Sequence, residues 1–199
     1  HFEPDVIRGY DALFVGGASA ASVLEPERFP FLHSGRRLMR HCLEQHLPVF
    51  ASCFGFQMAV LELGGDIVRH EEDFEMGTLP IRVTEHGHDD PVFGRGDRDL
   101  LAVAVHQESA VACPPGCVEL ARTERFCHSF RVEDRPFWAF QFHPELDKAR
   151  LVERLTIYKD GYTDGDNHLE EIIAGLQETP DSNQLLEAFV ERVLLSFDE

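Results

Sequence analysis

A short stretch between residues 48 and 65, PVFASCFGFQMAVLELGG, passes from a strand pattern to a helix pattern with no loop between them. The apolar run 48–52 is typical of a buried strand, and the segment 54–65 reads as a helix that ends at Gly64 and Gly65. Cys53 stands at the junction. Because a strand that runs directly into a helix is typical of parallel strands joined by crossover helices, this stretch favours the α/β fold class.

The segments around it continue this alternation. Residues 10–17 (YDALFVGG) form an apolar run stopped by two glycines, and residues 26–46 carry apolar side chains at helical spacing. Between residues 66 and 142, short strand-like runs are separated by turn-forming residues. We therefore expect a doubly wound, mainly parallel sheet flanked by helices, with some antiparallel strands, in a domain that covers residues 1–158.

A small helical C-terminal extension is expected over residues 159–199. A polar connector, 159–167, precedes two amphipathic segments at 168–177 and 180–197, the second of which starts at Pro180 and Asp181. The simpler expectation is that their apolar faces pack on the domain. The alternative is a docking surface for a partner or a second copy of the chain.

The composition excludes several classes of partner. The chain has 199 residues, of which 43% are apolar, and its 36 acidic against 18 basic side chains give a net charge of −18. Such a surface repels phosphate backbones and anionic lipids, so we expect neither nucleic-acid nor membrane binding. Five cysteines, an odd number, indicate reduced thiols and a cytoplasmic location.

A cysteine at a strand-to-helix turn gains two chemical advantages. Its side chain projects from the carboxyl edge of the sheet, and the first amides of the next helix favour a thiolate and a developing oxyanion. Ser52 and Gly55 supply the small residues that so tight a turn needs. The alternative is a buried structural cysteine, which is common for this residue type.

A second motif supplies what a nucleophilic cysteine requires. The aromatic run 137–142 ends in His143, Pro144 and Glu145. Pro144 stops the strand and stiffens the turn, so that His143 and Glu145 stay at the edge of the sheet. A cysteine nucleophile needs a base, and that base needs an orienting partner. Taken alone, the motif is an ordinary strand end. Together with Cys53, it predicts a triad.

At this point the chain resembles the class I, triad-type glutamine amidotransferase family, on the two motifs CFGFQ (53–57) and FQFHPE (140–145). The closest likeness is to stand-alone proteins similar to the glutaminase domain of GMP synthase. The resemblance covers residues 10–158 and implies a flavodoxin-like sheet. It implies Cys53 as the nucleophile, His143 as general base and acid, and Glu145 as the group that orients His143.

The resemblance also implies further site residues. The glycine turn at Gly16 and Gly17 matches the family's oxyanion turn, with the Gly17 and Phe54 amides as donors. Residues matched to substrate contacts are Gly16, Gln57, Gln107, Glu108 and Ser109. Family members start with a strand, a helix and a second strand, whereas nine residues precede Tyr10 here. We therefore expect that these elements are missing from the chain.

The implied reaction is hydrolysis of the γ-carboxamide of glutamine through a cysteine thioester, with ammonia passed to a separate synthetase. This stretch of sequence carries no P-loop motif of its own. Alternatives are a stand-alone γ-glutamyl hydrolase, a cysteine peptidase of the same fold, and a non-catalytic module that senses a ligand.

No cofactor and no metal site are expected. Cys113, Cys117, Cys127 and His128 contain residue types that bind zinc, but their C-x3-C spacing fits no common site. The acidic run 70–75 (HEEDFE) is interpreted as a solvated loop that could also border the entrance to the site.

Overall fold

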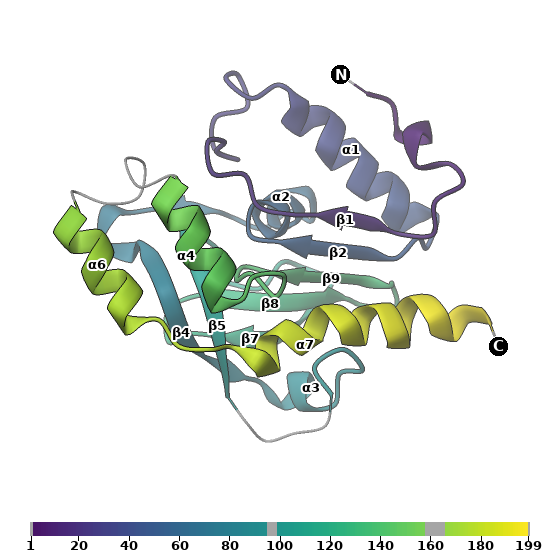
Figure 1. Ribbon diagram of the computed structural model, residues 1–199. Coiled ribbons are helices and arrows are strands. Elements are labelled where there is room, and N and C mark those ends of the chain that lie inside the picture. The colour runs from purple at the N-terminus through teal and green to yellow at the C-terminus, as the bar shows by residue number, and fades with distance from the viewer. Residues whose placement is uncertain (1, 95–98, 158–165, 199) are drawn as a thin grey trace.

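The computed structural model describes residues 2–94, 99–157 and 166–198, and it is built around a seven-stranded mixed sheet (Figure 1). In order across the sheet, the strands are β1 (Leu13–Val15), β2 (Val49–Ser52), β9 (Phe137–Phe140), β8 (Cys127–Val132), β7 (Cys117–Arg122), β4 (Glu75–Val83) and β5 (Leu100–His106). The short strands β3 (Val68–Arg69) and β6 (Glu108–Ser109) pair separately, antiparallel to each other. The α/β fold class is thereby confirmed.

The parallel part of the sheet contains the strand-to-helix junction. β2 pairs in parallel with β1 on one side and with β9 on the other. Strands β8, β7, β4 and β5 extend the sheet through antiparallel pairings. The carboxyl ends of β1, β2 and β9 therefore meet at one edge, where their following residues can converge.

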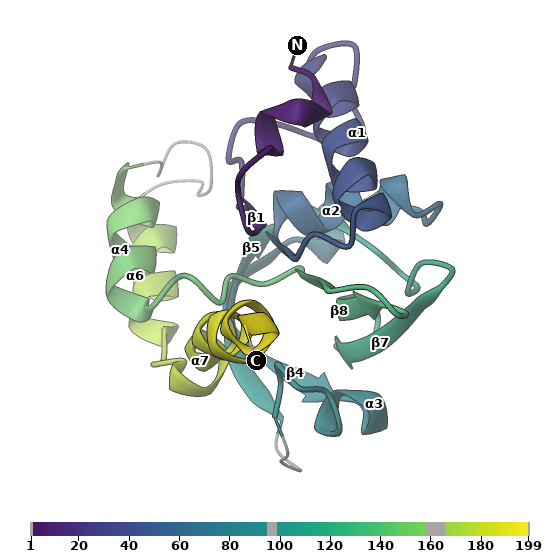
Figure 2. The same cartoon turned by 90° about the vertical axis from the view of Figure 1, so that its right-hand side faces the viewer.

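The helices lie on both faces of this sheet. They are α1 (Phe31–Glu44), α2 (Phe54–Glu62), α3 (Glu85–His88), α4 (Lys148–Ile157), α6 (Asp166–Gly175) and α7 (Pro180–Phe189). Short 3-10 helices lie at Pro4–Ile7, Glu71–Asp73 and Leu195–Asp198, and a π-helical segment, Val190–Leu194, continues α7. Figure 2 shows α1 and α2 on one face and α7 on the opposite face, with α4 and α6 side by side at one end. Arg36 and Arg40 of α1 both pair with Glu62 at the end of α2, which ties the two helices together.

Successive side chains of β2 and β9 point to opposite faces of the sheet, so these strands contribute to two apolar cores. The first core lies on the side of α1 and α2, and the second lies on the side of α7. Val49 and Ala51 pack with α1 and α2, whereas Phe50 packs on the face of α7. Phe137 and Ala139 of β9 likewise face the first core, and Trp138 and Phe140 face the second. Both strands read as continuous apolar runs because both of their faces are buried.

The C-terminal helices pack on the sheet, as the simpler expectation has it. Leu185 and Phe189 of α7 and Val193 beyond it are buried among the second-core residues, and Leu176, just after α6, packs with Val103 of β5. Residues 158–165, which hold most of the predicted connector and the predicted domain boundary, lie outside the described residues. Within the described ranges, no helix is both long enough and apolar enough to cross a bilayer.

The acidic run 70–75 is only partly the solvated loop that the sequence suggests, because His70 and Glu72 are exposed but other residues of the run are not. Asp73 is buried and paired with Arg125, and Glu75 is the first residue of β4. For Asp73 and Glu75 the interpretation was wrong, because these two carboxylates have basic partners far away in the sequence, which a local charge pattern does not reveal.

Phe189 joins α7 to the sheet. Its ring contacts those of Phe14, Phe50 and Trp138 at centroid distances of 5.7, 5.3 and 5.8 Å. We expect Phe189→Ala to lower the free energy of unfolding by about 3–5 kcal/mol, because it leaves a cavity in the second core. Urea denaturation measures this. Leu195→Ala, at a side chain that is 61% exposed, should change it by less than about 0.5 kcal/mol, and equal losses would contradict this account.

Candidate active site

Cys53 occupies a strained turn between β2 and α2. Its backbone has φ 51° and ψ −103°, outside both the strand and the helix regions. The turn brings α2 so close to β1 that a Cβ on Gly55 would lie 2.4 Å from the carbonyl oxygen of Val15. Glycine is therefore required at position 55. Strain of this kind is typical of functional positions, where the surrounding structure holds the residue in place.

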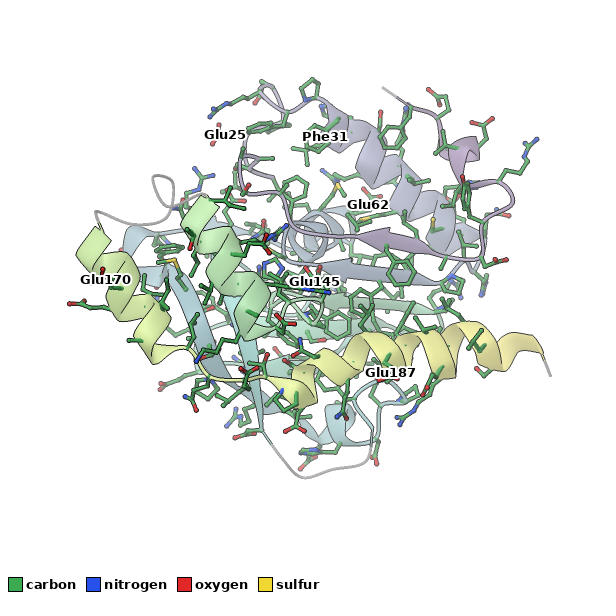
Figure 3. The ribbon with its side chains drawn as sticks, viewed as in Figure 1. Glu25, Phe31, Glu62, Glu145, Glu170 and Glu187 are labelled. Atoms are coloured by element: carbon green, nitrogen blue, oxygen red, sulfur yellow. The ribbon has the colours of Figure 1, made fainter. Side chains whose placement is uncertain are left out.

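His143 and Glu145 follow β9 and reach the same edge. The Nδ1 atom of His143 lies 2.7 Å from Oε1 of Glu145, and the backbone N–H of His143 donates to the carbonyl of Val103 at 2.8 Å. Figure 3 shows Glu145 in the middle of the molecule, beside α4. With Nδ1–H donated to the carboxylate, the other ring nitrogen of His143 is left for Cys53.

The charges of these groups support one another. Burial by itself lowers the pKa of His143, but interactions with Cys53 and Glu145 outweigh burial and raise it above its usual value. Burial by itself raises the pKa of Glu145, yet the neighbouring imidazole, with a smaller contribution from Ser52, brings it below its usual value. An ionised carboxylate thus faces an imidazole that favours its protonated form.

Of the two glycines in the predicted oxyanion turn, Gly17 lies closer to His143 and Cys53. A Cβ at Gly17 would lie 2.9 Å from Cε1 of His143 and 3.7 Å from Sγ of Cys53, whereas one at Gly16 would meet nothing within 4 Å. Phe54, the other predicted donor, is the first residue of α2. Its amide lies at the positive end of the helix dipole.

A cavity of about 380 Å³ opens beside Cys53. Its wall includes most of the predicted site residues: Gly17, Cys53, Phe54, Gln57, Gln107, Glu108 and His143. Gly16 and Ser109 are not in this wall, and Ser109 instead has its Oγ 3.3 Å from Nδ1 of His106. Glu145 stands behind His143.

Gln57 and Glu108 are fixed by contacts within the wall. The Gln57 side-chain amide donates to the carbonyl of Glu108 at 2.9 Å. The Glu108 carboxylate accepts from Ser22 Oγ at 2.5 Å and from the Val23 amide at 3.2 Å, and it pairs with Arg69. Because these donors occupy the carboxylate, the Glu108 side chain holds the wall together.

The comparisons with known proteins show the family of this chain. The family profile for "Glutamine amidotransferase class-I" matches residues 11–155. The chain belongs to the class I glutamine amidotransferase family.

Two relatives and two solved structures illustrate this similarity. A GMP synthase of Prochlorococcus marinus is 26% identical over 70% of this chain, and a gamma-glutamyl-L-1-hydroxyisopropylamide hydrolase of Pseudomonas sp. is 26% identical over 62% of it. The chain spans 28% and 45% of the lengths of these two relatives. A glutamine amidotransferase from Thermotoga maritima superposes with a TM-score of 0.77 and 22% identity, over 93% of this chain and 78% of that one. A glutamine amidotransferase from Methylobacillus flagellatus gives a TM-score of 0.68 and 19% identity, over 93% and 78%.

Several residues at this candidate site have no signal in the sequence. Asn183 of α7 donates from its side-chain amide to the carbonyls of Pro144 and Leu146, at 2.9 and 2.8 Å, and so fixes the turn around Glu145. Arg154 of α4 and Arg69 of β3 belong to the cavity wall. No motif marks them, because each reaches the site from an element separate from the Cys53 and His143 motifs.

The close approach of Gly17 gives a matched pair of variants. Gly17→Ala adds a methyl group too close to the His143 ring, so the ring must shift and its position relative to Cys53 must change. We expect alkylation of Cys53 by iodoacetamide, followed by mass spectrometry, to slow by roughly ten-fold or more. Gly16→Ala should have a clearly smaller effect, since its methyl group meets open space. Equal effects of the two variants would contradict the role assigned to this contact.

Glu145→Gln tests the electrostatics of the pair. The variant keeps the size of the side chain but removes a negative charge beside the imidazolium, so the pKa of His143 should fall. An NMR titration that follows the Cε1 proton of His143 measures the shift. Glu153→Gln, at an exposed position on α4, is the control and should leave this titration unchanged. An unchanged His143 titration in Glu145→Gln would show that the carboxylate does not stabilise the imidazolium.

Proposed function

We propose that this protein hydrolyses the γ-carboxamide of glutamine through a thioester on Cys53 and delivers the ammonia to a separate acceptor enzyme. The observation that carries the proposal is the meeting of the strained Cys53 turn with the His143–Glu145 pair at one cavity. Family membership supports the same chemistry.

In the first half of the reaction, the Cys53 thiolate attacks the amide carbon of the substrate. The amides of Gly17 and Phe54 stabilise the negative charge on the amide oxygen. His143 gives a proton to the amide nitrogen, the carbon–nitrogen bond breaks, and ammonia leaves. Glu145 keeps the imidazole in the orientation that this transfer needs.

In the second half, water replaces the thiolate. His143 takes a proton from the water molecule, whose oxygen attacks the thioester carbon. The carbon–sulfur bond then breaks, and glutamate and the Cys53 thiolate are released. The cavity of about 380 Å³ has room for an amino acid of this size.

Recognition of the substrate is assigned to the rest of the cavity wall. Gln57, the backbone at Gln107 and Glu108, and Arg154 line this part. Arg154 is exposed, and no ion-pair partner for it is present among residues 2–94, 99–157 and 166–198. Its guanidinium is therefore available for the α-carboxylate of the substrate.

A γ-glutamyl amide is the second candidate substrate. The Pseudomonas relative is named as a hydrolase of such a compound, and it matches 62% of this chain. In this case the same residues cleave a substituted amide and release an amine instead of ammonia. The GMP synthase similarity favours the first candidate, with a synthetase as the acceptor.

Turnover by the purified chain, with glutamine and with a γ-glutamyl alkylamide, tests the proposal. We expect glutamate release that falls at least about 1,000-fold in Cys53→Ala, because the nucleophile is lost. Cys117→Ala, at a half-buried cysteine outside the cavity wall, is the control and should keep the activity. The larger kcat/KM identifies the preferred substrate.

Labelling with a glutamine-analogue chloroketone is a second test, which applies even if turnover requires a partner enzyme to complete the site. The reagent should modify Cys53 and spare the other cysteines, which mass spectrometry of peptides detects. If neither substrate is turned over and Cys53 reacts no faster than Cys117, the proposed chemistry is wrong.

A further inference from the structure

Three chemically complementary side chains meet behind the cavity wall, apart from Cys53. Glu75 begins β4 and pairs directly with His106 at the end of β5, and His128 lies on β8. Oε2 of Glu75 lies 3.0 Å from Nε2 of His106 and 3.1 Å from Nε2 of His128. The two imidazole rings are 5.7 Å apart between centroids.

These atoms are buried and lie close to one another, but the contacts among them do not have the geometry of hydrogen bonds. His128 is fully buried, His106 is 5% exposed, and the Glu75 side chain is 18% exposed. Within the described part of the chain, Oε2 of Glu75, Nε2 of His106 and both ring nitrogens of His128 make no directed hydrogen bond. Buried polar atoms without partners are rare and costly, and a bound ion is one common explanation for them.

We propose that Glu75, His106 and His128 form a binding site for a divalent transition metal, best matched by Zn²⁺. Two imidazoles and one carboxylate are a known ligand set for zinc, with a further position for water. Metal–ligand bonds of about 2.0–2.2 Å at angles between about 90° and 110° separate ligand atoms by roughly 3.0–3.5 Å, so only small shifts are needed here. Of all described His, Cys, Asp and Glu side chains, these form the single group of three with ligand atoms within 4.8 Å of one another.

The residue types suit a metal. Metal ions bind ionised carboxylates and neutral imidazoles, and this group brings one carboxylate and two imidazoles together.

The group lies near the surface and has a supporting contact. Glu75 also lines a surface hollow with Leu79, Arg122 and Thr123. The other ring nitrogen of His106, Nδ1, lies near Oγ of Ser109, and an outer contact of this kind orients a metal-bound imidazole.

The consequence of metal binding concerns the cavity wall. His106 is itself part of that wall, between Val105, whose carbonyl lies 3.8 Å from Sγ of Cys53, and Gln107. A metal held by His106 would tie this segment to β4 and β8. The role is structural: the ion orders the wall and takes no part in bond breaking.

Zinc titration of the full-length chain, stripped beforehand with a chelator, tests the site. The titration uses the Cys53→Ala background, so that the Cys53 thiol cannot bind zinc and the result does not depend on the proposed hydrolysis. We expect one zinc ion per chain and a rise in the melting temperature. Glu75→Gln and His128→Gln should each weaken binding at least about 100-fold, since a ligand is lost. His86→Gln, at an exposed histidine on α3, is the matched control and should bind as tightly as the background protein.

Cobalt substitution identifies the ligands. Nitrogen and oxygen ligands predict visible d–d bands without the intense thiolate-to-cobalt band that Cys113, Cys117 and Cys127 would give. Absence of zinc binding, a thiolate band, or unchanged affinity in Glu75→Gln would each overturn the proposal. If His128→Gln does not fold, Glu75→Gln, which keeps the side-chain shape, decides the outcome alone.

Discussion

The backbone of Cys53 is the constraint on which the candidate site depends. Its φ of 51° is unfavourable for a residue with a Cβ, by about 1–3 kcal/mol, and it persists because its surroundings are fixed on every side. β2 is paired with strands on both sides, and the Cys53 amide donates to Phe140 of β9 at 2.8 Å. Gly55 then lets α2 pack against β1, which keeps the first amides of the helix beside the sulfur atom.

The two apolar cores meet at this site from opposite faces of the sheet. α2 carries the segment after Cys53 and belongs to the first core, whereas α7 packs in the second core through Leu185 and Phe189. Asn183, on α7, holds the carbonyls on both sides of Glu145. The C-terminal helix therefore fixes the turn that orients His143, and its packing and the geometry of the site are linked.

What the sequence can predict follows from how local each signal is. The strand, Cys53 and the helix after it are adjacent in the chain, and so are His143 and Glu145, so their patterns predict the junction and the turn correctly. Asn183 and Arg154 reach the site from other helices, and no local pattern marks them. Cys113, Cys117 and Cys127 drew attention through their spacing, whereas Glu75, His106 and His128 come together only through strand pairing. A long-range register is not encoded in spacing.

The acidic character of the chain has a second consequence inside the fold. Its net charge of −18 repels other anions at the surface, but several of its carboxylates are buried against specific cations. Glu62 pairs with Arg36 and Arg40, and Glu108 pairs with Arg69. Removing Arg69 would leave the buried Glu108 carboxylate without its cation, and an uncompensated buried charge costs about 3–5 kcal/mol. Glu75 differs because it faces two imidazoles, which carry no obligatory charge. A metal cation bound there would bring to this carboxylate the positive charge that arginine side chains bring to Glu62 and Glu108.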